Sequence, residues 1–329
     1  PNVISIWLND GRGNYRRVGA AVLDGPPNFV TAADFDGDGA QDLAVAVATY
    51  AGSGRLLVLS GRGDGSFAPP RSYAAGPQSE YVAAGDLDGD GLPDLVVSNY
   101  GFTQGSPGSI SVFLNRGAAG FADAVEYPTG PGAAGIAFAD LDRDGAQDLV
   151  IANASAPSVT TWHNAGDGTL DVMRLYPTVG AGTEVATGDF DGDGWPDVVK
   201  SYAVVLWNDG TGGFSSRNMQ SSFTYGGHGA LATSDVDRDG LPDVAIAPSI
   251  PWYWGNTIAW FKNSGERTFE SGGHYWFFLG LSIDFLRFAD VDGNGAEEIV
   301  LAANAVSYGP GRLWVVRRVR GSVFEGFQD

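Results

Sequence analysis

The feature that most constrains the fold of this chain is an acidic segment of nine residues that occurs six times. Its first copy, DFDGDGAQD at residues 34–42, carries four carboxylates. Five related segments follow at intervals of 46 to 55 residues. A regular period of about 50 residues is typical of repeat architectures, in which each repeat forms the same supersecondary unit. The six copies are residues 34–42, 86–94, 140–148, 189–197, 235–243 and 290–298.

A second segment recurs between the acidic ones and consists of an apolar run, a glycine-rich turn and an aromatic or apolar residue. ISVFLNRGAAGF at residues 110–121 is an example. With the apolar runs that flank each acidic segment, it predicts four short strands in every repeat. The chain has 49 glycines among 329 residues, about twice the usual share, which suits many tight turns. The copies begin at residues 4, 56, 110, 159, 203, 258 and 313.

Four strands in about 50 residues predict a β-propeller blade. No stretch has a sustained helical period, so we expect an all-β fold with almost no helix. A β-solenoid is the alternative, although its coils are usually shorter and lack internal hairpins. The chain opens with half a blade and continues with six repeats. This favours a ring of seven blades, in which the half-blade closes against the last repeat. The alternative is that the chain is cut from a longer one. We expect a single domain, residues 1–329, with a half-blade at 1–28 and repeats starting near 29, 81, 135, 184, 230 and 285.

Within each acidic segment, places one, three, five and nine carry side chains with oxygen donors. Place six is always glycine, which allows a positive φ, and place seven varies, as expected where only the carbonyl is a ligand. This order of donors is typical of a calcium loop, and the lack of His and Cys favours Ca²⁺ over zinc or copper. The predicted calcium ligands are Asp34, Asp36, Asp38, Ala40, Asp42, Asp86, Asp88, Asp90, Leu92, Asp94, Asp140, Asp142, Asp144, Ala146, Asp148, Asp189, Asp191, Asp193, Trp195, Asp197, Asp235, Asp237, Asp239, Leu241, Asp243, Asp290, Asp292, Asn294, Ala296 and Glu298.

The charge of the chain supports a bound cation. The ligand places hold 23 of the 39 acidic residues, and six Ca²⁺ ions would change the formal charge from −20 to −8. An acidic surface turn is the alternative for any one copy, but six copies in register favour a metal. Place two is always apolar, so we expect its side chain beneath the loop. The sequence therefore predicts up to six structural Ca²⁺ ions, each holding one hairpin together.

The repeated pattern Asp-x-Asp-x-Asp-Gly-x-x-Asp resembles that of the FG-GAP (VCBS-like) calcium propeller family, over nearly the whole chain. The "FG" and "GAP" words are kept only loosely, as in Gly120-Phe121 and Gly213-Phe214. This family includes the propellers of integrin α subunits and some fungal and bacterial lectins. The resemblance implies a propeller with calcium in the acidic loops. It does not imply one function, because such propellers serve as adhesion domains, lectins and lyases.

Ligand binding is expected in the loops at the end of the blades opposite to the acidic segments, since binding residues concentrate on variable loops of a rigid scaffold. Aromatic residues cluster in two stretches that we assign to this end. Aromatic rings stack on sugars and anchor protein partners, although they could also pack between blades. The candidate ligand-binding residues are Trp252, Tyr253, Trp254, His274, Tyr275 and Trp276.

Catalysis is the less favoured interpretation. His163 is expected at a strand end, and His228 and His274 in loops between blades, where a Tyr/His pair could abstract a proton in a polysaccharide lyase. An acidic substrate would need a positive cleft, and Arg287 is the one nearby candidate. The net charge of −20 also argues against nucleic acid as a partner.

No apolar run of 18 residues is present, so we expect no membrane insertion. Cysteine is absent, which excludes disulfides and thiolate metal sites. The leading hypothesis is a secreted or cell-surface module, stabilised by calcium at extracellular concentrations, that binds a glycan. The alternatives are an extracellular protein partner, as in adhesion, a calcium-dependent polysaccharide lyase, and a purely structural domain of a larger protein.

Overall fold

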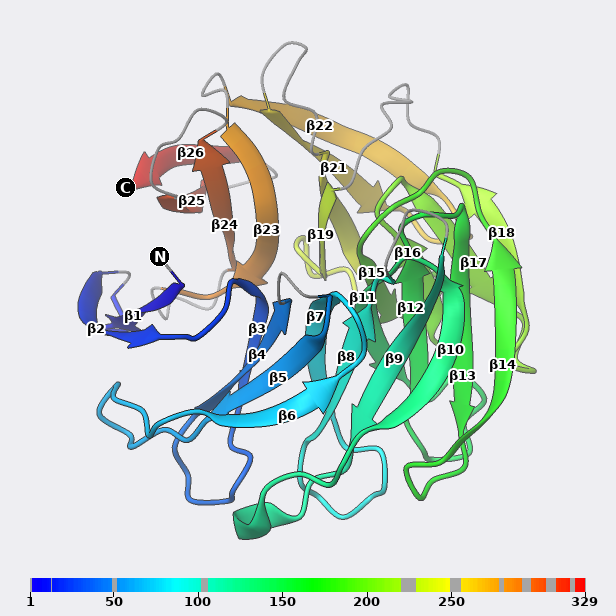
Figure 1. The fold of residues 1–329 in the computed structure, drawn as a ribbon. Helices are drawn as coiled ribbons and strands as arrows, with labels where there is room; N and C mark the ends of the chain where they lie inside the picture. The colour runs from blue at the N-terminus through cyan, green and yellow to red at the C-terminus, as the bar shows by residue number, and fades with distance from the viewer. Residues whose placement is uncertain are drawn as a thin grey trace. The chain divides into compact units, whose positions relative to one another are not determined.

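Antiparallel sheets follow one another along the chain in the computed structural model (Figure 1). The structure describes residues 2–12, 14–48, 52–101, 106–219, 229–248, 256–277, 281–291, 297–305, 312–319 and 323–328. In these residues there are six four-stranded sheets and one two-stranded sheet, and a single turn of 3-10 helix, η1 (Gly117–Ala119). The β-propeller architecture and the near absence of helix are as predicted. None of the helical structure described here could cross a membrane.

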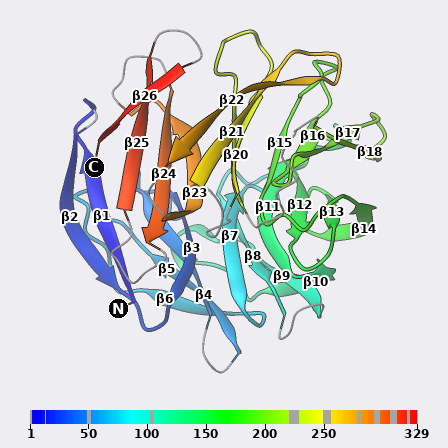
Figure 2. The same cartoon turned by 90° about the horizontal axis from the view of Figure 1, so that it is seen from above.

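The chain divides into two compact units, and the first comprises Pro1–Asp10 and Tyr15–Pro177. It holds the two-stranded sheet, in which the strands of the predicted half-blade pair, and three complete sheets (Figure 2). Its strands are β1 (Val3–Asn9), β2 (Tyr15–Val22), β3 (Pro27–Ala33), β4 (Asp42–Ala48), β5 (Gly54–Leu59), β6 (Arg71–Ala75), β7 (Ser79–Gly85), β8 (Asp94–Asn99), β9 (Pro107–Phe113), β10 (Val125–Pro131), β11 (Ala133–Ala139), β12 (Asp148–Asn153), β13 (Ser158–Asn164) and β14 (Leu170–Pro177).

The second unit comprises Gly11–Asn14 and Thr178–Asp329 and contains three complete sheets. Each sheet is made of four strands that are consecutive in the sequence, as in the first unit. Its strands are β15 (Val185–Gly188), β16 (Asp197–Lys200), β17 (Val204–Asn208), β18 (Phe214–Asn218), β19 (Gly229–Ser234), β20 (Asp243–Pro248), β21 (Asn256–Asn263), β22 (Phe269–Phe277), β23 (Leu281–Ala289), β24 (Glu298–Ala305), β25 (Arg312–Val319) and β26 (Val323–Gln328).

The position of a strand in its sheet explains its composition. The second strands, such as β8 and β12, are buried along their whole length. They read as continuous apolar runs because both of their faces are covered, whereas an alternating pattern belongs to a sheet with one wet face. The fourth strand lies at the edge of its sheet, and β14 is mostly exposed. Each acidic segment joins the first strand of a complete sheet to the second.

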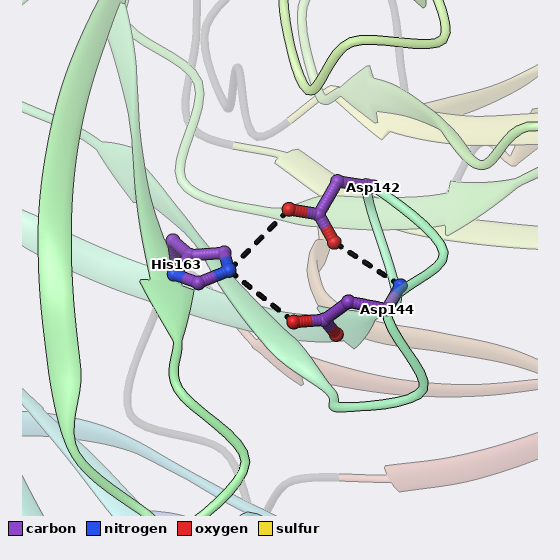
Figure 3. Close-up of side chains that lie close together, drawn as sticks. All are labelled: Asp142, Asp144 and His163. Carbon is purple, nitrogen blue, oxygen red and sulfur yellow. Dashed lines mark hydrogen bonds and ion pairs between the residues drawn. The ribbon is translucent and has the colours of Figure 1, made fainter.

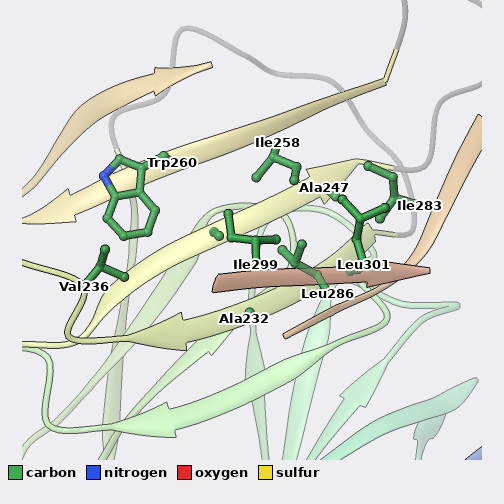
Figure 4. Close-up of a cluster of buried hydrophobic side chains, with 11 residues drawn as sticks. Ala232, Val236, Ala247, Ile258, Trp260, Ile283, Leu286, Ile299 and Leu301 are labelled. Carbon is green, nitrogen blue, oxygen red and sulfur yellow. The ribbon is translucent and has the colours of Figure 1, made fainter. Parts of the chain in front are cut away.

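Apolar side chains fill the space between consecutive sheets within each unit. In the second unit, Ile258 and Trp260 of β21 belong to one buried cluster with Leu286 of β23 and Leu301 of β24 (Figure 4). Val236, at place two of its acidic segment, joins the same cluster. The other place-two side chains Phe35, Leu87, Leu141, Phe190 and Val291 are also buried, as predicted. The acidic loops are therefore anchored in the apolar layers between the sheets.

Candidate metal centres

The aspartate at place one closes each acidic loop around its own carboxylate. In the first segment, Oδ1 of Asp34 accepts a hydrogen bond from the backbone N–H of Gly37 and Oδ2 accepts one from that of Gly39, both at 2.8 Å. The bond from the place-six glycine recurs in the next four segments at 2.8–3.0 Å. This glycine has a φ of +87° to +97° in the five segments. The positive φ predicted for place six is confirmed.

The aspartate at place nine is buried and fixes the loop to the sheet. Asp94 is 0% exposed, and its Oδ2 accepts from the backbone N–H of Leu87 at 2.8 Å. Its Oδ1 accepts from the N–H of Asn115, two residues after the end of the third strand, at 2.7 Å. Equivalent pairs of bonds hold the place-nine residues Asp42, Asp148, Asp197 and Asp243.

The carboxylates converge at distances that suit a hard cation. In the first segment, oxygens of Asp34, Asp36 and Asp42 lie within 4.8 Å of one another. The same three places converge in segments 140–148 and 189–197, whereas in segment 86–94 the cluster is formed by Asp86, Asp88 and Asp90. Calcium takes six to eight oxygens at about 2.3–2.6 Å, so oxygens on opposite sides of one ion are about 5 Å apart. This set of oxygen donors therefore fits Ca²⁺, and all of the negative charge in the set comes from carboxylates.

Burial makes the place-nine carboxyls costly to ionise without a cation. Loss of hydration raises the pKa of Asp197 to about 7 and the pKa values of Asp94, Asp148 and Asp243 to about 6. Backbone N–H donors oppose this effect, and the other carboxylates of the loop add to it. Loss of hydration also raises the pKa of Asp42. A bound divalent cation would remove this cost by neutralising the charge.

Acidification should stabilise the metal-free protein between pH 7.5 and 5.5. In this window the folded place-nine carboxyls hold protons that the unfolded chain, with an aspartate pKa near 3.9, has lost. The free energy of unfolding of the metal-free protein therefore falls as the pH rises. Urea unfolding of chelated protein should give a value at pH 5.5 that is higher than at pH 7.5 by roughly 1 kcal/mol or more. In excess calcium the sign should reverse, because protons compete with the ion. A metal-free midpoint that drops on acidification would contradict this prediction.

A buried asparagine at the end of the third strand links neighbouring sheets. Nδ2 of Asn115 donates to the carbonyl of Phe35 in the preceding acidic segment and to that of Pro93 in its own, both at 2.9 Å. Its Oδ1 accepts from the N–H of Gly117 at 2.9 Å. Asn164 and Asn263 make the same three bonds in their blades. This asparagine stands in the repeated segment of the sequence, as in ISVFLNRGAAGF, but its role in linking the sheets was not predicted.

Nitrogen-bearing side chains meet the carboxylates at places three and five in three segments. Nε2 of His163 lies 3.3 Å from Oδ2 of Asp142 and 3.4 Å from Oδ2 of Asp144 (Figure 3). Lys262 forms ion pairs with the corresponding pair, Asp237 and Asp239. In segment 189–197, Arg267 forms ion pairs with Asp191 and Asp193. The sequence offered a sign of His163 and Lys262, because each is a polar residue directly before the asparagine of its repeat. The second complete blade has Leu114 at that position.

Replacing Lys262 should strengthen calcium binding by segment 235–243. The ammonium group competes with a divalent cation for the same two carboxylates, and its positive charge repels an incoming calcium ion. We expect Lys262→Leu, which copies Leu114 of the second blade, to lower the dissociation constant of one calcium site several-fold. Equilibrium dialysis at a free calcium concentration that fills only the tighter sites should then retain one additional ion. An unchanged calcium isotherm would show that Lys262 does not reach the metal.

The structure describes the first five predicted calcium segments throughout, but Asp292, Asn294 and Ala296 of the sixth lie outside the described residues. Asp290 is described and exposed, and the backbone of Glu298 begins β24. The role of the place-seven carbonyl as a ligand stays a prediction.

The predicted aromatic patch is described only in part. Trp252, Tyr253 and Trp254 lie outside the described residues, as does His228. The prediction that His274 lies in a loop between blades is wrong, because the backbone of residues 274–276 belongs to β22 and pairs with β21. Gly272 falls at a β-bulge opposite Trp260 and Phe261, and Gly273 pairs with Trp260, so both glycines before His274 lie within a strand and not in a loop.

Arg287, the cation considered for a lyase, contacts the backbone of the fold. Its Nη1 donates to the carbonyls of Leu231 at 3.1 Å and Leu286 at 2.8 Å. Its guanidinium group also lies 4.8 Å from the centre of the Phe285 ring. These contacts give the side chain a structural role between β19 and β23.

Comparison with family models identifies this repeat. The model described as FG-GAP-like repeat matches residues 34–97, 101–151, 140–199 and 235–301, and the FG-GAP repeat model matches residues 82–113. No curated protein matches the sequence.

Solved structures share the fold at low sequence identity. An Agrocybe aegerita lectin, described as recognising non-reducing terminal N-acetylglucosamine, matches with a TM-score of 0.61 and 18% identity, over 100% of this chain and 93% of its own. A proposed 6-phosphogluconolactonase of Bacteroides uniformis matches with a TM-score of 0.64 and 11% identity, over 98% and 90%. At these identities the likeness establishes the fold alone.

Proposed function

The chain belongs to the FG-GAP-like repeat family, and on that premise we propose that it is a calcium-stabilised binding module that acts outside the cell. The observation that carries the calcium part is the convergence of three carboxylates in each of four loops. Backbone N–H groups already donate hydrogen bonds to these carboxylates, and one oxygen of each carboxylate in a cluster lies within 4.8 Å of the others. Without a cation, these arrangements bring like charges together in the four loops.

The proposed ions are structural. Each loop is closed by its own place-one aspartate and tied to the third strand by place nine, so its ligands come from one short segment. A structural ion of this kind needs no substrate beside it. Sites of modest affinity would fill at millimolar extracellular calcium and stay empty in the cytosol. Sites of this affinity would suit a protein that is secreted or displayed on the cell surface.

A glycan is the proposed class of ligand. Two features support it: the aromatic residues 252–254 and 274–276, whose rings could stack on sugars, and the lectin with the same fold. The protein-binding alternative rests on the same aromatic residues. The lyase alternative is not proposed further, because His274 lies in a strand and Arg287 contacts backbone carbonyls.

A glycan array probed with calcium-loaded protein tests the ligand class. We expect binding to a restricted set of sugars, lost in Trp254→Ala and Trp276→Ala but kept in a control, Trp7→Ala, which removes a tryptophan of β1 that is 52% exposed. Binding that all three variants keep would contradict the assignment to the aromatic patch. No glycan binding by folded, calcium-loaded protein would overturn the carbohydrate proposal and favour a protein partner.

A further inference from the structure

His163 is placed to act as a metal ligand in one acidic loop. It lies near the end of β13, and its imidazole points at the loop formed by residues 140–148 (Figure 3). In both aspartates that face the imidazole, one carboxylate oxygen accepts a hydrogen bond from the loop backbone and the other lies near the ring. Oδ1 of Asp142 accepts from the N–H of Asp144 at 3.3 Å, and Oδ1 of Asp144 accepts from the N–H of Ala146 at 2.8 Å. The loop thus uses each Oδ1, and both Oδ2 atoms face the imidazole.

The second ring nitrogen of His163 is held by a carboxylate. Nδ1 lies 2.7 Å from Oδ1 of Asp171 on β14. A carboxylate beside one nitrogen favours the tautomer that is protonated there and leaves the lone pair of the other nitrogen available. Histidines that bind metals commonly have such a carboxylate on their far nitrogen, which fixes the ring and raises its basicity. Asp171 therefore orients Nε2 toward Asp142 and Asp144.

The other blades provide independent evidence that a cation belongs between places three and five. Lys262 occupies the place equivalent to His163, directly before Asn263 of its repeat, and its ammonium group pairs with Asp237 and Asp239. The guanidinium group of Arg267 pairs with Asp191 and Asp193. Those two segments have a permanently charged side chain at this point. The imidazole of His163 can instead lose a proton and, in its neutral form, offer a nitrogen lone pair, so a metal cation can take the corresponding position.

The geometry points to a site for a divalent transition-metal cation of the Zn²⁺ or Co²⁺ class, bound by Nε2 of His163 and Oδ2 of Asp142 and Asp144. Ligands about 2.0–2.1 Å from a tetrahedral ion are separated by about 3.3–3.4 Å. The two nitrogen–oxygen distances, 3.3 and 3.4 Å, equal this separation. Imidazole suits zinc and its neighbours, whereas calcium selects oxygen. The site shares two aspartates with the proposed calcium loop, so the two ions would compete there.

Cobalt(II) titration of the full chain tests this inference, because a site with nitrogen and oxygen ligands gives visible d–d absorption. The protein is first freed of metal by chelation and dialysis. We expect one equivalent of Co²⁺ to bind with a visible spectrum and to be displaced by Zn²⁺. His163→Leu, which copies Leu114 of the second blade, should weaken this binding at least tenfold. Asp171→Asn should weaken it by about 10-fold to 100-fold, as expected for a residue that orients a ligand.

Two controls separate this site from the rest of the protein. Replacing His228 and His274 together should leave the Co²⁺ spectrum unchanged, and His163→Leu should bind calcium in segments 34–42 and 86–94 as the wild type does. Co²⁺ binding by His163→Leu with unchanged affinity and spectrum would overturn the inference. So would a wild-type protein that binds no Co²⁺ below millimolar concentration. Neither result depends on whether calcium fills the other loops, so failure here is distinguishable from failure of the proposed function.

Discussion

Removal of calcium should lower the melting temperature of this protein by about 10 °C or more. Each site filled at a ligand concentration 100 times its dissociation constant adds about 2.7 kcal/mol to the free energy of unfolding. Two such sites would add about 5 kcal/mol, and 1 kcal/mol corresponds to roughly 2–4 °C in domains of 150–250 residues. The expected loss is large because the four place-nine carboxyls whose pKa is raised to about 6 or 7 would remain buried without a counter-ion.

Differential scanning calorimetry in 10 mM calcium and in EGTA measures this effect. Calcium should restore the melting temperature, and magnesium at the same concentration should restore less, because Mg²⁺ demands octahedral geometry and sheds water reluctantly. A double variant, Asp86→Asn with Asp88→Asn, provides a control, since it should lose only the part contributed by its own segment. Equal melting temperatures in calcium and EGTA would mean that the segments are acidic turns without a metal.

Replacing the buried asparagine should destabilise the fold whether or not calcium is present. Asn115→Ala removes both donors from the carbonyls of Phe35 and Pro93 and the acceptor from the N–H of Gly117. Leaving buried polar groups unsatisfied costs about 1–3 kcal/mol for each group. We expect a net loss of about 2–4 kcal/mol, allowing for partial relaxation, in urea unfolding both in calcium and in EGTA.

A matched surface variant shows whether this loss is specific. Thr211→Ala deletes a hydroxyl that bonds to Asp209 at 2.6 Å in an exposed turn, and it should change stability by less than about 0.5 kcal/mol. An Asn115→Ala variant as stable as Thr211→Ala would contradict the proposed link between sheets. The first complete sheet lacks this amide naturally, since Gly61 stands at the equivalent place and keeps only the backbone bond to Asp42.

The elements that could be predicted from the sequence are those set by local pattern. The acidic segment fixed the repeat length, and the apolar runs around it indicated four strands in the correct order. The left-handed glycine at place six and the buried residue at place two also followed from the pattern. Place four is left-handed as well, but its conformation was hidden because Arg143 and Arg238 occupy it in two copies.

The features that were missed depend on register and on contacts between distant segments. His163 approaches Asp142 only because β12 and β13 pair in the observed register. The link from Asn164 to Leu87 spans 77 residues and joins two blades. His274 was placed in a loop between blades, whereas it lies in β22, whose pairing with β21 accommodates the nearby Gly272 in a bulge. Strand partners, and not local composition, determine each of these positions.

The most direct test is the number of calcium ions bound per chain. Chelated protein is brought to equilibrium by dialysis against 1 mM calcium, and bound metal is measured by atomic emission against protein concentration. Six acidic segments predict between four and six ions per chain, with the sites weakened by Lys262 and Arg267 filling last. Fewer than one bound ion per folded chain would contradict calcium binding by these loops.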